Sequence, residues 1–180
     1  MRRLLAAFLI SLAPLVPLAP ASAQVPPPGM RLSGEGSFRF LGMEVYHARL
    51  WVAPQFRAAD YTAYPLALEL NYRRGFTARA IAERSIQEMR RAGAFTESQA
   101  QSWLQALQAA LPDVKAGDRV TGLYRPGIGA AFRFQDRLVG EIADPEFARL
   151  FFGIWLAPQT SEPALRQALL SQAAPDPARP

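Results

Sequence analysis

Residues 140–170 read GEIADPEFARLFFGIWLAPQTSEPALRQALL and predict the end of a strand followed by two helices. Asp144 is typical of a helix cap, and Pro145 suits the first helical turn. An acidic residue directly after that proline also indicates a helix start, because the positive end of the helix dipole stabilises a negative charge there. The large apolar residues that follow predict a helix with a broad apolar face: Phe147, Leu150, Phe151 and Phe152. We interpret this aromatic cluster, together with Trp155, as core, and expect a second helix over residues 161–170.

The residues before this stretch alternate between strand-like and helix-like patterns. β-branched and aromatic residues predict strands at residues 32–40, 43–52, 66–72, 118–125, 130–135 and 137–142. Two helices are expected between the third and fourth strands, over residues 77–91 and up to residue 111, the second opened by a capping box of Thr96 and Gln99. This order predicts one α+β domain with a largely antiparallel sheet.

The N-terminal 23 residues, MRRLLAAFLISLAPLVPLAPASA, resemble a secretory signal peptide in every part. We expect cleavage after Ala23, a periplasmic product and no later segment that spans a membrane. Residues 24–30 are predicted to form an extended, Pro-rich leader, residues 31–172 a single domain, and residues 173–180 a disordered tail. The chain has no cysteine, so its stability in an oxidising compartment has to come from packing.

Composition excludes several classes of function. The net charge is +5, but positive and negative residues are interspersed, which argues against a nucleic-acid partner. Without cysteine and with His47 as its one histidine, the chain offers no clear metal site, and we expect no cofactor. His47 is interpreted as a packed or surface residue, and Arg84 with Glu88 as an ion pair on a helix surface. A cleft between the sheet and the helices would be apolar, and an Arg at its mouth would suit a carboxylate ligand.

Three segments resemble the chalcone isomerase-like family of exported bacterial proteins. They are VYHARLW at residues 45–51, IAERSIQEM at residues 81–89, and, most specifically, the stretch at residues 140–170. The resemblance covers about residues 31–170. It implies an open-faced sandwich, in which a large antiparallel sheet carries a layer of helices on one face, with a ligand cleft between the two layers.

The family resemblance also implies positions for a site. Plant members close a chalcone to a flavanone, whereas relatives of the same fold bind fatty acids without catalysis. The catalytic Arg of the enzymes falls near Phe38, with Arg39 one residue away, and their Thr, Tyr and Asn fall at Tyr46, Thr77 and Arg84. Because these residue types differ, we predict no catalytic residue. The ligand-binding candidates are Arg39, Tyr46, Thr77, Arg84 and Ser85, with Arg31 as a further carboxylate partner.

Three functions are therefore compared. The first is a non-catalytic periplasmic protein that binds a fatty acid or another small apolar ligand, such as a flavonoid-like molecule, in the cleft. The alternative is a structural or interaction protein of the cell envelope, in which the cleft is filled. The third is an intramolecular lyase of the chalcone isomerase type.

Overall fold

The computed structural model describes residues 27–173. The predicted signal peptide and its cleavage site lie outside these residues, as does the tail beyond Ala173. Residues 27–30, the described part of the predicted leader, form a turn rather than extended chain, closed by the Met30 N–H donating to the Pro27 carbonyl at 3.0 Å. Within residues 27–173, no helix has both the length and the apolar character needed to cross a membrane.

A six-stranded antiparallel sheet forms one layer, with the strands in sequence order. The strands are β1 (Arg31–Phe40), β2 (Met43–Val52), β3 (Leu66–Tyr72), β4 (Arg119–Arg125), β5 (Gly129–Phe134) and β6 (Arg137–Ile142). Each predicted strand is confirmed, with ends that differ by no more than a residue or two. This agreement is expected, because antiparallel neighbours can be read from local alternation and turns.

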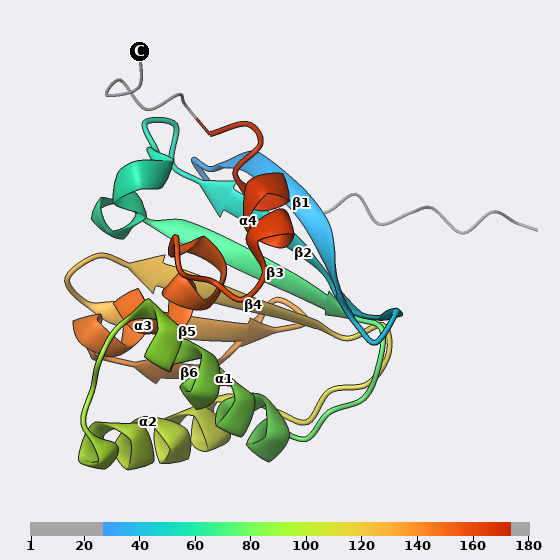
Figure 1. The fold of residues 1–180 in the computed structure, drawn as a ribbon, viewed down its shortest axis with the longest axis vertical. Helices are drawn as coiled ribbons and strands as arrows, with labels where there is room; N and C mark the ends of the chain where they lie inside the picture. Colours follow the sequence, from blue (N-terminus) through green and yellow to red (C-terminus); the bar gives the residue numbers. More distant parts are fainter. Residues whose placement is uncertain (1–26, 174–180) are drawn as a thin grey trace, which may run out of the picture.

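Residues 27–173 form four α-helices. They cover one face of the sheet, as Figure 1 shows. They are α1 (Ala78–Ala92), α2 (Glu97–Ala110), α3 (Pro145–Leu156) and α4 (Pro163–Leu169). The predicted caps are confirmed: Asp144 accepts from the N–H groups of Glu146 and Phe147 at 2.9 Å, and Thr96 forms a capping box with Gln99. The 3-10 helix η1 (Ala58–Ala63) was not predicted, because it lacks a continuous helical pattern.

Helix α4 lies directly on β1, and the strand has a glycine, Gly34, at the point where the two cross. A Cβ at Gly34 would collide with the carbonyl oxygens of Ala168 and Leu169. The backbones can approach this closely only without a side chain at residue 34. This contact closes the β1 end of the helical layer.

The two faces of the sheet differ in chemistry. On β2, Ala48, Leu50 and Val52 are buried against the helices. Between them on the outer face, Arg49 donates to Glu35 at 2.7 Å, and the His47 ring lies 3.5 Å from the same carboxylate. The outer face is nevertheless partly covered, since Ala67 of β3 is fully buried there. Partial cover on both faces explains why the polar alternation along residues 43–52 is imperfect.

Candidate functional site: a cleft between sheet and helices

A cleft of about 520 Å³ lies between the inner face of the sheet and the helices. Helix α1 packs mainly on α2 and α3 rather than on the sheet, and this leaves space under it. The lining is predominantly apolar and includes Phe38, Leu70, Val120, Phe132, Phe152 and Trp155. The volume lies within the range of about 300–1,000 Å³ that is typical of small-molecule sites. The cleft therefore suits an apolar ligand.

The aromatic cluster of α3 has two roles. Phe147 is fully buried in the core, as predicted for the whole cluster. Phe151, Phe152 and Trp155, however, also line the cleft. The same helix thus supplies both core packing and one wall of the site.

Two tyrosines, Tyr46 and Tyr72, line the cleft. The Trp155 Nε1–H donates to the Tyr46 hydroxyl at 3.0 Å, which fixes the ring of Tyr46 in place. Burial raises the pKa of both Tyr46 and Tyr72 well above the usual tyrosine value, so both hydroxyls stay neutral. Within residues 27–173, no hydrogen bond joins the Tyr72 hydroxyl to another side chain or to the backbone. Tyr72 can therefore donate to a ligand.

Glu88 is a buried carboxylate on the α1 wall of the cleft, with an exposed fraction of 8%. Arg84 contacts it at 2.7 Å, Arg91 at 3.3 Å, and the Ser161 hydroxyl donates to it at 2.8 Å. The predicted pair of Arg84 with Glu88 is thus present, but its acidic partner is buried rather than at the surface. Because Glu88 balances Arg84, that arginine is a poor partner for a ligand carboxylate.

Arg74 is the arginine best placed to receive an anionic group. It follows β3 in the loop before α1, is exposed, and lines the cleft. Among the residues that the structure describes, no acidic side chain forms an ion pair with it. A guanidinium can hold a carboxylate with two parallel hydrogen bonds, so Arg74 can bind the acidic end of a ligand.

No group of three or more His, Asp or Glu side chains within residues 27–173 could hold a metal ion. His47 lies on the outer face, with Nδ1 3.2 Å from the Ser37 hydroxyl, and so is remote from the cleft. The cleft lining combines an apolar wall with tyrosines, arginines and the carboxylates of Glu88 and Glu162.

Comparison with known proteins identifies the fold. The family model described as chalcone isomerase-like matches residues 19–171. The chain belongs to the chalcone isomerase-like family. The crystal structure of a fatty-acid binding protein from Arabidopsis thaliana is similar to it, with a TM-score of 0.62 and 13% sequence identity, over 80% of this chain and 88% of that one. At that identity the likeness shows the fold, the predicted α+β open-faced sandwich.

A curated relative from Haemophilus influenzae, described as an uncharacterized protein, is 30% identical over 108 residues. The match covers 60% of this chalcone isomerase-like protein. The chain spans about half of that relative's length, 52%.

The structure places three of the five ligand-binding candidates of this chalcone isomerase-like protein in the cleft wall: Tyr46, Arg84 and Ser85. The Ser85 hydroxyl donates to the Ile81 carbonyl one turn earlier at 2.8 Å, so its hydrogen is already used. Thr77 is not among the lining residues. Its hydroxyl caps α1 by accepting from the Ala80 N–H at 3.1 Å.

The two predicted arginines of β1 also lie outside the cleft. Arg39 pairs with Glu44 at 3.3 Å, while its neighbour Phe38 lines the cleft. The Arg31 guanidinium donates to the Gln172 carbonyl at 2.8 Å. Near the position predicted for the enzymes' arginine, Phe38 therefore lines the cleft, and neither Arg31 nor Arg39 of β1 does so.

Two cleft residues were missed by sequence reasoning. Tyr72 stands on the same predicted face as Leu66, Leu68 and Leu70, and this alternation was a signal for its inward position. Arg74 carried no such signal, because it lies in a loop where neither strand nor helix periodicity applies.

The buried tyrosines make stability sensitive to alkaline pH. Burial also raises the pKa of Tyr61, to about 12. Because the folded-state pKa of each group lies above its unfolded value, the stability that it contributes is complete below about pH 10 and is lost as the pH rises further. We expect the free energy of unfolding, measured by urea denaturation, to fall above about pH 10 by up to about 1.4 kcal/mol per pH unit for each group.

The variant Tyr72→Phe tests this assignment, because it removes one titrating group and no intramolecular hydrogen bond within residues 27–173. Its free energy of unfolding at neutral pH should be close to that of the wild type. Above about pH 10 that free energy should fall less steeply, because one fewer buried tyrosine titrates. An identical pH slope for both proteins would contradict the assignment.

Proposed function

We propose that this protein binds a fatty acid, or another small apolar molecule with one acidic end, and does not catalyse a reaction. The observation that carries the proposal is the combination of an apolar cleft of about 520 Å³ with Arg74 in its lining, an arginine that forms no ion pair with any acidic side chain of residues 27–173. The apolar chain would lie among the aromatic side chains, and its carboxylate would lie at Arg74. The Arabidopsis protein of the same fold is described as a fatty-acid binding protein, which supports this ligand class.

The residues at the family's enzymatic positions argue against catalysis. Ring closure of a chalcone needs a positive group that stabilises the developing enolate. Here Phe38 stands at that position and faces the cleft, and Arg39 is held by Glu44 outside it. A binding protein needs no such group. The open cleft also favours this function over the interaction protein with a filled cleft.

The location in the cell belongs to the same proposal. The signal-peptide pattern of residues 1–23 supports export to the periplasm. Fractionation of cells that express the full chain, with mass spectrometry of the product, should give a periplasmic protein that begins at Gln24. An uncleaved chain in the cytoplasm would overturn this part.

The variant Arg74→Ala tests the polar end of the site. We expect it to weaken palmitate binding roughly tenfold, measured by displacement of a fluorescent fatty acid, because a charge-assisted contact at an exposed site is lost. Binding of methyl palmitate, which lacks the carboxylate, should not change.

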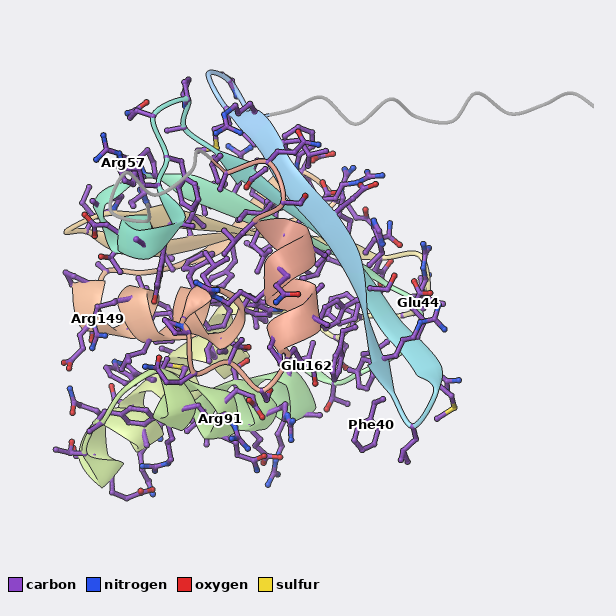
Figure 2. All side chains as sticks on the ribbon, turned by 45° about the horizontal axis from the view of Figure 1, so that its top comes forward. Phe40, Glu44, Arg57, Arg91, Arg149 and Glu162 are labelled. Atoms are coloured by element: carbon purple, nitrogen blue, oxygen red, sulfur yellow. The ribbon has the colours of Figure 1, made fainter. Side chains whose placement is uncertain are left out.

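Arg57→Ala is the matched control for this test. Arg57 is exposed, forms no ion pair with the described residues, and does not line the cleft. Figure 2 labels Arg57 at the opposite side of the molecule from Phe40 of β1. Equal losses in the two variants would show only a general effect of charge, and unchanged palmitate binding by Arg74→Ala would assign the carboxylate elsewhere.

A further inference from the structure

The hairpin between β1 and β2 exposes apolar side chains at its end. We call residues 40–43 the hairpin tip. Leu41 has an exposed fraction of 81%, Phe40 of 57% and Met43 of 43%. Figure 2 shows Phe40 at this end of the hairpin, where the two strands project beyond the helical layer. Water therefore meets three large apolar side chains in one short loop.

The backbone of the tip makes the leucine more unusual. Leu41 and Gly42 both have positive φ, 49° and 77°, as in a two-residue hairpin loop that favours Asn, Asp or Gly. The loop between β5 and β6 has the same feature, with φ of 48° at Gln135 and 70° at Asp136, and both residues there are polar. Both the exposure of the Leu41 side chain to water and its positive φ are unfavourable for the folded chain. Leu41 therefore does not stabilise the fold, which indicates a role in contacting another molecule.

Positive charge surrounds the tip. Arg39 and Arg73 flank it, with side chains that are 62% and 50% exposed. Arg74 follows Arg73 in the chain and lines the cleft. Glu44 contacts both flanking arginines at 3.3 Å and balances one of them. Two flanking arginines against one acid leave a net positive charge beside the apolar residues. This combination suits the interface of an anionic lipid bilayer, where apolar groups enter the acyl region and arginines meet phosphate groups.

The tip is also part of the cleft. Phe40 and Met43 are exposed at the tip and at the same time line the cleft, as Arg74 does. The apolar surface is therefore continuous from the end of the hairpin into the binding site. A surface that touches the tip also touches the mouth of the cleft.

We infer that the hairpin tip docks on an anionic lipid bilayer and sets the mouth of the cleft at the headgroup layer. A lipid with an acidic end then passes between bilayer and cleft along apolar surface, without crossing water. The transfer step rests on the proposed function, whereas docking itself does not.

Flotation with vesicles tests the docking. The full chain should float with vesicles of phosphatidylglycerol and phosphatidylcholine in equal amounts, and more weakly with phosphatidylcholine alone. The variant Leu41→Asn should reduce vesicle affinity about tenfold, because one large apolar side chain no longer enters the bilayer. Its thermal unfolding temperature should be equal to or higher than that of the wild type, since Asn suits the turn.

Leu138→Asn is the matched control. Leu138 lies on β6 with an exposed fraction of 59%, and it does not line the cleft. Every chain carries the same N-terminal residues, so a difference between the two variants reports on the tip. Equal losses in both variants, or no flotation of the wild type, would overturn the inference.

Two further outcomes are distinguishable. A wild-type dimer that Leu41→Asn converts to a monomer in the absence of vesicles would assign the tip to a second copy of the chain and overturn docking. Fatty-acid displacement without vesicles tests the proposed function separately. Flotation without fatty-acid binding would retain the docking and reject the ligand, and fatty-acid binding without flotation would do the reverse.

Discussion

Filling the cleft with the substitution Ser85→Phe is expected to abolish fatty-acid binding while the protein stays folded. Ser85 lines the cleft from α1 and has an exposed fraction of 7%. A phenylalanine ring from this position would occupy space that the ligand chain needs. Among the described residues, the serine hydroxyl bonds only to the Ile81 carbonyl of its own helix, so its removal leaves no buried donor there without a partner.

Although Ser85→Phe should lose its affinity for the fatty acid, its stability should be equal to or higher than that of the wild type. An aromatic ring in apolar space adds buried area, and cavity-filling substitutions commonly stabilise proteins by about 0.5–2 kcal/mol. Displacement of a fluorescent fatty acid and thermal unfolding, measured on the same sample, check the two halves of the prediction. The variant should give no displacement signal and an unfolding temperature no lower than the wild type.

Ser85→Ala separates the ring from the hydroxyl. It removes the same hydroxyl but leaves the cleft open, so binding should be retained. If Ser85→Phe binds a fatty acid as the wild type does, the ligand does not occupy this cleft and the proposed function is wrong. If Ser85→Ala also loses binding, the hydroxyl is a ligand contact rather than a part of the wall.

The elements of this fold could be predicted because their signals are local. Strand alternation, the Asp144 cap and the capping box of Thr96 and Gln99 each involve residues within one turn or one strand. The direction in which the side chains around the site point was harder to predict from the sequence. Pairing between β1 and β2 shifts by one residue between the pairs Phe38 with Tyr46 and Arg39 with Glu44.

That shift is a β-bulge, and it changes which side chains reach the cleft. Val45 has no partner in the pairing, and both Val45 and Tyr46 line the cleft although they are adjacent in the strand. A strict alternation of residues 43–52 would have put them on opposite faces. Bulges redirect side chains in this way and leave little trace in a single sequence.

Long-range contacts explain the remaining difference. Glu88 and Arg84 were expected to pair because they are four residues apart on one helix. The burial of Glu88 and its contact with Ser161, 73 residues along the chain, depend on the packing of α1 beside the segment before α4. Arg74 likewise becomes a candidate ligand group only when the loop after β3 is placed beside the cleft.

Phe152→Ala is expected to produce the largest loss of stability among these variants, about 3–5 kcal/mol in the free energy of unfolding. Phe152 is fully buried, and its ring packs edge-on against Tyr124 and Phe151 at centroid distances of 5.3 and 5.4 Å. It also forms a wall of the cleft, so its removal enlarges the cleft instead of creating an isolated void. Urea denaturation of the variant without ligand measures this loss.

Ligand should recover part of that loss, since a molecule that binds only the folded state stabilises it. A fatty acid in the enlarged cleft replaces some of the contacts that the ring made, so palmitate should raise the unfolding temperature of Phe152→Ala. Phe56→Ala is the matched control, because Phe56 is equally buried but does not line the cleft. Its loss of stability should be similar, and palmitate should stabilise it no more than the wild type. A rescue that is equal in the two variants would mean that the ligand does not contact the wall formed by Phe152.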